Sequence, residues 1–322
     1  MTPLSTPPII IDSTILMSMR SCSRKFYNEF VRRKTLAERS IPLRAGGAFA
    51  AGLEQYRIAH YVHNLSPASC LESAIAAMSI SWGESDPFPP DPKTQSTYVA
   101  RTLARTISAL RAYVTLWPPA LDRLQPIPMN RESETSFEYS FSLPLDDPMF
   151  PLHPNGEPYI FAGRCDTLGT YDGIPCWSDE KTTGAMGVTW AQQWPLRNQF
   201  IGYRWALRAL GRSERLCVVR GICILKEDVK LAEAQVHYPD HLLSDFAHTL
   251  AHDLNTLNYC FEHNVWNKEF GDSCTAYGGC DYRDLCLAAP SIERAALRSY
   301  ADRTWDPTAR HERPRVLSAW NQ

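Results

Sequence analysis

The sequence predicts an α/β fold in which a mixed central sheet is flanked by helices. Apolar residues recur at helical spacing before residue 120, whereas the segment that starts at residue 133 alternates apolar and polar residues as a strand does. Helical patterns then return between and after the later strand-like segments, an order that favours one α/β domain. With 322 residues, of which 44% are hydrophobic, the chain can form a sizeable core.

The first part of the chain is expected to be mainly helical. A short proline-rich arm precedes Ser13, which we interpret as a helix N-cap. A proline-rich loop interrupts the helical pattern further on. The expected segments are the arm at 1–12, helices at 13–35, from Gly47 to about 62, at 68–82 and at 96–116, and the loop at 84–95.

The second part is expected to supply the sheet. Two strand-like segments meet at Asp172-Gly173, a dipeptide typical of tight hairpin turns. An amphipathic helix, two more strands and a long helix follow. The expected strands are 133–145, 159–172, 174–183, 215–226 and 231–238, and the expected helices are 191–210 and 241–264.

Composition excludes some classes of protein and leaves others open. The net charge of −2 gives no overall attraction to nucleic acid, and the basic residues near the start are best interpreted as a solvated helix face. No apolar run is long enough to span a bilayer, and the first residues do not resemble a signal peptide. We therefore expect no membrane association and an intracellular, cytoplasmic location, where cysteines stay reduced.

The central hairpin carries the residues most suited to catalysis. Asp166 lies on its first strand, while Asp179 and Lys181 lie on the second and share one face, since side chains alternate along a strand. Two converging carboxylates suit Mg²⁺ or Mn²⁺, and an adjacent lysine can orient water and stabilise charge on phosphate. A surface hairpin with an ordinary salt bridge would show the same short pattern. Gln199 and Tyr203, four residues apart on the next helix, favour the catalytic interpretation.

The ordered series GRCD at 163–166, DEKTT at 179–183 and Q-x-x-x-Y at 199–203 resembles the PD-(D/E)XK nuclease superfamily in its RecB-like branch. The resemblance runs from about residue 18 to 287. It implies a restriction-endonuclease-like core and a metal-dependent DNA nuclease, with Asp166, Asp179 and the backbone carbonyl of Glu180 as metal ligands. It also implies that Lys181 is catalytic, and that Gln199 and Tyr203 position the nucleic-acid strand or the active-site loop.

Four cysteines form a second candidate site. Cys274, Cys280 and Cys286 have five residues between neighbours, and Cys22 lies far upstream. Buried or loop cysteines would be the simpler interpretation, but the segment around the last three has little apolar sequence. Four thiolates suit either zinc or an iron–sulfur cluster. Iron–sulfur members of the RecB-like branch hold a 4Fe–4S cluster with one N-terminal and three C-terminal cysteines, so the resemblance implies the cluster. Cys217 and Cys223, in contrast, are expected to be small buried hydrophobic residues.

The resemblance also fixes the expected domains and one departure from the family. The expected arrangement is an arm at 1–12, a nuclease domain at 13–290 whose segments 13–35 and 270–290 bind the cluster, and a C-terminal helix or tail at 291–322. The family usually has a histidine where this chain has Ala50. Glu54, one turn later, could face the same pocket or be an ordinary surface residue. Glu138, on the strand before the hairpin, could lie near the metal pocket, but an exposed strand carboxylate is the favoured interpretation.

The resemblance implies an exonuclease acting on single-stranded DNA or DNA ends, with DNA and a DNA-processing protein as partners. The missing histidine motivates an alternative, which is a catalytically weak or inactive protein of the same fold that binds DNA or joins a complex. A zinc-stabilised scaffold unrelated to nucleases is the third hypothesis.

Overall fold

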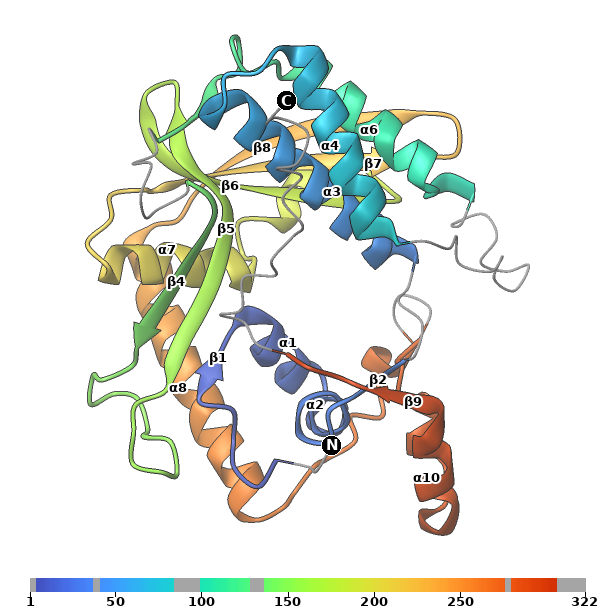
Figure 1. Ribbon diagram of the computed structural model, residues 1–322. Helices are drawn as coiled ribbons and strands as arrows, with labels where there is room; N and C mark the ends of the chain where they lie inside the picture. Colours follow the sequence, from blue (N-terminus) through green and yellow to red (C-terminus); the bar gives the residue numbers. More distant parts are fainter. Residues whose placement is uncertain (1–3, 37–40, 84–98, 128–135, 276–278, 306–322) are drawn as a thin grey trace.

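The computed structural model describes residues 4–36, 41–83, 99–127, 136–275 and 279–305, and it has the expected α/β architecture (Figure 1). Seven strands in this part of the chain form a mixed sheet in which β5 and β6 are central. The strands are β1 (Ile10–Ile11), β3 (Leu124–Pro126), β4 (Phe137–Pro144), β5 (Ile160–Tyr171), β6 (Ile174–Thr183), β7 (Leu216–Ile224) and β8 (Val229–His237).

The sheet order explains why it is mixed. The strands run β1-β5-β6-β7-β8, and β3 and β4 also pair with β5. β6 and β7 are parallel, so the chain must cross over between them, and α7 (Asn198–Ala209) lies in this connection. β1 is also parallel to β5. In contrast, β4 and β6 pair antiparallel with β5, and β8 pairs antiparallel with β7. The proline-rich arm therefore contributes a short strand.

Helices cover both faces of the sheet (Figure 1). α7 and α8 (Asp240–Glu262) enclose the larger hydrophobic core, which includes Trp177, Phe161 and Phe200. On the other face, α3 (Ile41–Arg57), α4 (Pro67–Trp82) and α6 (Leu103–Leu116) form a second core with Ile222 and Ile224 of β7. Cys217 and Cys223 of β7 are both buried, as expected from the apolar sequence around them.

The two ends of the described chain pack against each other (Figure 1). β2 (Lys34–Leu36) pairs antiparallel with β9 (Tyr300–Asp302), and Glu293 forms ion pairs with Arg24 and Arg32. The remaining elements of this region are α1 (Ser13–Ser21), α2 (Ser23–Phe26), α9 (Arg283–Leu287) and α10 (Pro290–Ala296). Of the expected C-terminal helix or tail at 291–322, the described part contains most of α10 and then β9, and residues 306–322 lie outside the described residues.

The predicted helix at 13–35 was wrong in its length. Cys22 has an extended backbone (φ −174°, ψ 117°) and separates α1 from α2. Asp12 rather than Ser13 is the N-cap, since its side chain accepts a 2.7 Å hydrogen bond from the backbone amide of Ile15.

Three other predicted helices differ in their bounds. The helix expected from Gly47 starts at Ile41. The helix expected at 96–116 has its start outside the described residues; residues 99 and 100 are helical, and α6 begins after an interruption at Leu103, with Thr102 as its N-cap. The helix expected at 191–210 is a 3₁₀ turn, Trp190–Gln193, followed by α7 from Asn198. The proline-rich loop at 84–95 lies outside the described residues.

Candidate active site

The candidate site lies where the central hairpin opens. At its turn, Asp172 and Gly173 both have positive φ (49° and 81°), as the predicted tight turn requires. β5 and β6 pair from this turn as far as Thr167 and Ser178. The next residues along the two strands are Asp166 and Asp179, and beyond them β6 continues to pair with β7. Both carboxylates therefore lie at the point where two adjacent strands separate.

The geometry around Asp179 brings together most of the predicted site. Lys181 Nζ lies 2.6 Å from Asp179 Oδ1, and the Asp179 side chain is almost fully buried. On its other oxygen, Asp179 faces Gln199 Nε2 at 3.4 Å, and the same amide nitrogen donates to the Tyr203 hydroxyl at 3.0 Å. The expectation that Asp179 and Lys181 share a strand face is confirmed, and α7 supplies the two polar residues that cover it.

Asp166 joins this group through the backbone. Its Oδ2 accepts a 2.7 Å hydrogen bond from the amide nitrogen of Glu180. The carboxylate thus satisfies an amide close to where the β5–β6 pairing ends.

The side chain of Glu180 points away from Asp179. Arg57 of α3 reaches Glu180 with Nη2 at 2.6 Å from Oε1 and Nη1 at 3.3 Å from Oε2. Tyr113 of α6 donates a 2.9 Å hydrogen bond to the same Oε1. This arrangement is consistent with the expectation that Glu180 would take part through its backbone carbonyl rather than its side chain.

A pocket of about 200 Å³ lies beside these residues. Ala50 and Glu54 line it from α3, so the position at which the family usually has histidine does face the site. Asp179 is not in the lining, but its carboxylate forms an ion pair with Lys181, which is. The lining residues are Gly46, Phe49, Ala50, Leu53, Glu54, Arg57, Glu138, Asp166, Glu180, Lys181 and Thr182.

Glu138 belongs to this pocket, which is the less favoured of the two positions that the sequence suggested for it. Its neighbours Phe137 and Tyr139 pair with Thr167 and Cys165, which places Glu138 opposite Asp166. It forms a 2.6 Å ion pair with Arg164, and its backbone is left-handed (φ 52°), a conformation rare for glutamate within a strand. Strand alternation alone could not reveal this role, because it depends on the register between β4 and β5.

The electrostatics of the site reflect crowded negative charge. Burial, and then the carboxylates of Asp179, Glu180 and Glu138, raise the pKa of Asp166 well above its usual range. Burial also raises the pKa of Asp179, although Lys181 opposes this. Burial lowers the pKa of Lys181, but Asp179 and Asp166 outweigh it and the net direction is upward. A cation held between the two aspartates would relieve this repulsion.

The donor chemistry of the pocket fits a divalent ion such as Mg²⁺ or Mn²⁺. No group of three or more His, Cys, Asp or Glu side chains in the described part of the chain is arranged to hold a metal by itself. Mg²⁺ does not need such a cage, since it usually binds through one or two carboxylates and keeps several waters or substrate phosphates. Asp166 and Asp179 can provide those two carboxylates.

The four candidate cluster cysteines differ from the other six. Cys22, Cys274, Cys280 and Cys286 are partly exposed, whereas the remaining six are buried. The backbone amide of Cys280 donates to the carbonyl of Cys274 at 3.1 Å. Burial and the nearby thiols of Cys22 and Cys280 raise the pKa of Cys286. The described cysteines are not arranged as a closed metal site, but thiol chemistry and the packing of the two chain ends fit a thiolate-bound group.

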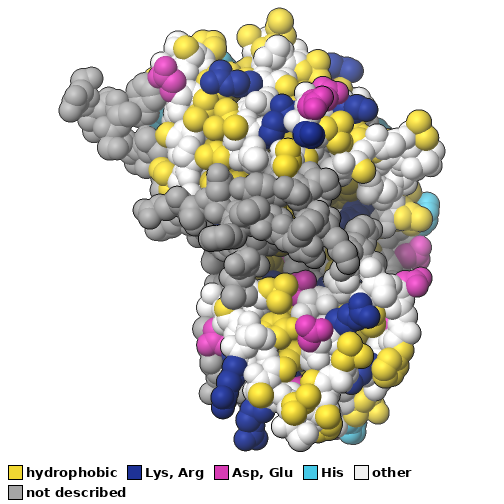
Figure 2. Space-filling view, turned by 90° about the vertical axis from the view of Figure 1, so that its right-hand side faces the viewer, with side chains coloured by type: hydrophobic (Ala, Val, Ile, Leu, Met, Phe, Trp, Pro, Cys, Tyr) yellow, Lys and Arg dark blue, Asp and Glu magenta, His cyan; other side chains and the backbone are white. Residues whose placement is uncertain are grey.

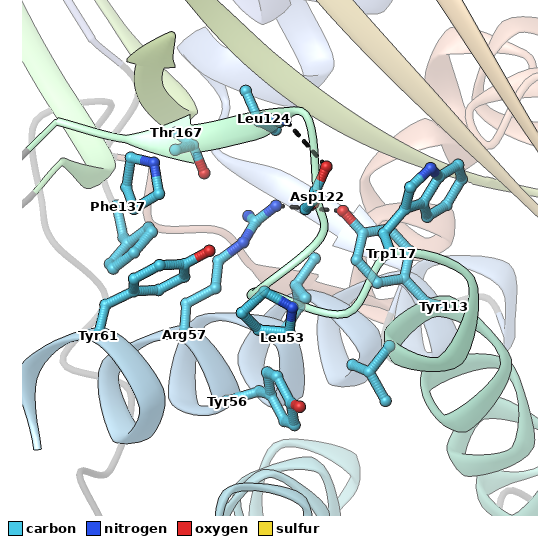
Figure 3. A pocket seen from close by; sticks show the side chains of 13 residues that line it. Leu53, Tyr56, Arg57, Tyr61, Tyr113, Trp117, Asp122, Leu124, Phe137 and Thr167 are labelled. Carbon is cyan, nitrogen blue, oxygen red and sulfur yellow. Dashed lines mark hydrogen bonds between the residues drawn. The ribbon is translucent and has the colours of Figure 1, made fainter. Parts of the chain in front are cut away.

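Behind the site, a second cavity of about 20 Å³ lies between α3, α6 and the sheet (Figure 3). Arg57, Tyr61 and Thr167 point into it, and the buried hydroxyl of Thr167 has no hydrogen-bond partner there. The volume is sufficient for one water molecule. This cavity is therefore too small to be a separate binding site for a ligand larger than water.

The distribution of charged side chains on the surface does not indicate a particular binding partner. On the face shown in Figure 2, the described Lys and Arg side chains are interspersed with hydrophobic and acidic ones. None of the helices in the described segments combines the length and apolarity that a bilayer crossing requires.

Comparisons with known proteins identify no family. No protein-family model matches the chain, and no curated protein matches it. Among solved structures, the chain is similar to a candidate exonuclease from Eubacterium rectale, with a TM-score of 0.42 and 10% identity over 83% of this chain and 88% of that one. It is also similar to SSO0001, with a TM-score of 0.30 and 13% identity over 77% of this chain and 84% of that one.

A third similar structure is that of LHK-Exo in complex with dAMP, with a TM-score of 0.28 and 14% identity over 67% of this chain and 94% of that one. Similarity at this level carries no argument about function, which must rest on the side chains of the site.

Proposed function

We propose that the chain is a metal-dependent DNA nuclease that hydrolyses phosphodiester bonds, with Asp166, Asp179 and Lys181 as its central residues. The observation that carries this proposal is the opening of the β5–β6 hairpin, where two carboxylates and one ammonium group meet beside a pocket. The residue series described from the sequence supports the same assignment.

Each residue has a distinct proposed role. Asp166 and Asp179, with the carbonyl of Glu180, would hold Mg²⁺ or Mn²⁺, which supplies Lewis acidity toward phosphate. Lys181, held by Asp179, orients the attacking water and stabilises negative charge that grows on the phosphate oxygens. Gln199 fixes the Asp179 carboxylate from α7, and Tyr203 fixes Gln199. Glu54 lines the pocket from α3 and contributes a further oxygen donor.

The proposed substrate is single-stranded DNA or DNA ends, attacked as an exonuclease, and a DNA-processing protein is the proposed partner. Sequence-specific recognition is not proposed, since no helix-turn-helix or similar base-reading element is recognisable in the sequence.

We also propose that Cys22, Cys274, Cys280 and Cys286 bind a 4Fe–4S cluster, with zinc as the alternative. Such a group would join the segments that already meet through β2 and β9. Its role would be structural, because a link between distant segments reduces the entropy of the unfolded chain. Reduced thiols in an intracellular, cytoplasmic enzyme agree with this assignment. Anaerobically purified protein should contain about four iron atoms and absorb near ~400 nm. Zinc in place of iron would support the alternative.

Catalysis is tested with end-labelled single-stranded DNA and Mn²⁺, comparing the unaltered protein with Asp179→Asn. Metal-dependent shortening that the substitution abolishes is expected. If both proteins leave the DNA intact across metals and end polarities, the nuclease proposal is wrong.

A second candidate function is DNA binding without cleavage, and Ala50 is the observation that favours it. Ala50 lines the pocket but offers no metal ligand. An inactive protein that retards single-stranded DNA in a gel equally well with and without Mn²⁺ would establish this alternative.

A further inference from the structure

Arg57 and Glu180 form a buried ion pair behind the candidate metal site. The pair joins the last residue of α3 to the middle of β6, and only 10% of the Arg57 side chain and 4% of the Glu180 side chain are exposed. Both guanidinium Nη atoms contact the carboxylate, so the pairing is bidentate.

The neighbouring polar groups support the pairing of Arg57 with Glu180. The hydroxyl of Tyr113 donates to Glu180 and accepts from Arg57 at 3.1 Å. Arg220, which is also buried and contacts the same Tyr113 hydroxyl, forms its ion pairs with Asp122 and Glu233. Among the described residues, Glu180 is therefore the carboxylate that pairs with Arg57 (Figure 3 shows Arg57 beside Tyr113 and Asp122).

This pairing changes the charge that a metal ion would experience. Four carboxylates line the pocket, from Glu54, Glu138, Asp166 and Glu180. Arg57 neutralises Glu180 and holds it against α3 and α6, on the opposite strand face from Asp179. A divalent ion bound between the two aspartates would not be coordinated by this carboxylate.

We propose that Arg57 is a positioning residue that sets the charge of the metal site by holding Glu180 as a neutral pair. This inference rests on the proposed function, because it assumes that Asp166 and Asp179 bind the ion. It predicts that loss of Arg57 alone tightens metal binding, since one positive charge near the ion disappears. Loss of both the Arg57 and the Glu180 charge should restore the original net charge near the ion, and with it the original metal affinity.

The test is Mn²⁺ affinity, measured by calorimetry and by electron paramagnetic resonance of free Mn²⁺, without DNA or turnover. Arg57→Gln should bind Mn²⁺ on the order of 10²-fold more tightly, as expected for one unit charge about 10 Å from a divalent ion at an effective dielectric constant near 20. The double variant Arg57→Gln/Glu180→Gln should bind within about threefold of the unaltered protein, because the pair it removes is neutral. Arg105→Gln is the matched control: Arg105 of α6 donates to the carbonyls of Leu225 and Asp228, away from the pocket.

The outcomes distinguish a wrong role for Arg57 from a wrong metal site. A double variant that loses as much affinity as Asp179→Asn would show that Glu180 is itself a ligand and would overturn the inference. Unchanged affinity in Arg57→Gln would also overturn it. If Arg57→Gln does not fold, Arg57→Met/Glu180→Met replaces the pair with apolar side chains of similar length and must bind Mn²⁺ as the unaltered protein does. Absence of Mn²⁺ binding in the unaltered protein contradicts the proposed metal site, and this inference with it, whereas failure of the variants alone contradicts only the role of Arg57.

Discussion

The carboxylate of Asp166 accepts a 2.7 Å hydrogen bond from the backbone amide of Glu180, close to where β5 and β6 separate. The amide of the residue that follows Asp179 is thus held by the carboxylate of the neighbouring strand. One side chain therefore stabilises the strand opening and also faces the second aspartate. The opening in turn leaves room for the pocket that Lys181 and Glu54 line.

Lys181→Ala should abolish DNA cleavage with little effect on metal binding. Removing a preorganised group that stabilises transition-state charge typically lowers the rate about 10²–10³-fold. Asp179 loses its cationic partner but not its carboxylate, so Mn²⁺ affinity should not fall. The measurement is single-turnover cleavage of end-labelled DNA, with Mn²⁺ affinity determined separately. Lys226→Ala, which changes an exposed lysine, is the control. Equal cleavage rates in the two variants would assign catalysis to a different lysine.

Gly163→Ala should destabilise the protein and disturb the site at the same time. A Cβ at Gly163 would lie 2.4 Å from a ring carbon of Phe141 and 2.6 Å from one of Tyr203, so these rings must shift. Overpacking of this kind costs about 1–3 kcal/mol. Because Tyr203 holds Gln199 against Asp179, cleavage should slow as well.

The matched substitution for this experiment is Gly47→Ala. Gly47 lies inside α3 and a Cβ there would contact nothing within 4 Å. Alanine is the better helix former, so this variant should gain up to about 1 kcal/mol. The two free energies of unfolding are measured with urea, and a stable Gly163→Ala protein with normal cleavage would contradict the predicted overpacking.

The sequence was sufficient to predict the hairpin and its principal residues. Strand alternation places Asp179 and Lys181 on one face, and helical spacing places Gln199 beside Tyr203, because both rules depend only on local geometry. The same rules leave Glu138 open between the pocket and the surface, and they do not predict the role of Arg57. Glu138 reaches the pocket through the register of β4 on β5, and Arg57 reaches Glu180 across two elements that are distant in sequence.

Ala50→His should strengthen metal binding at the site. Ala50 lines the pocket together with Asp166, and an imidazole at this position adds the ligand that the RecB-like pattern usually has. Mn²⁺ affinity should rise by about tenfold or more, in line with the effect of one supporting group on metal affinity. Ala50→Asn, which places a polar but weaker donor at the same position, is the comparison. An Ala50→His protein with unaltered Mn²⁺ affinity would show that α3 is too far from the ion to supply a ligand.

Asp12 should make stability depend on pH between about 4 and 6. Its side chain is 8% exposed, and burial raises its pKa from 3.8 to about 6, although the amides of Ile15 and Thr14 oppose this. The folded state therefore binds the proton more tightly than the unfolded state. The contribution of Asp12 is most favourable below pH 4 and is lost as the pH rises through 6, with a total change of about 3 kcal/mol.

Asp12→Asn isolates this effect, because asparagine is an equally good N-cap and carries no charge. Relative to the unaltered protein, the variant should gain up to about 3 kcal/mol in free energy of unfolding between pH 4 and pH 7. Urea unfolding at pH 4, 5, 6 and 7 measures the difference. Asp245→Asn, which changes an exposed aspartate of α8, should show no comparable gain. A constant difference between Asp12→Asn and the unaltered protein across this range would mean that Asp12 titrates alike in the folded and unfolded chains.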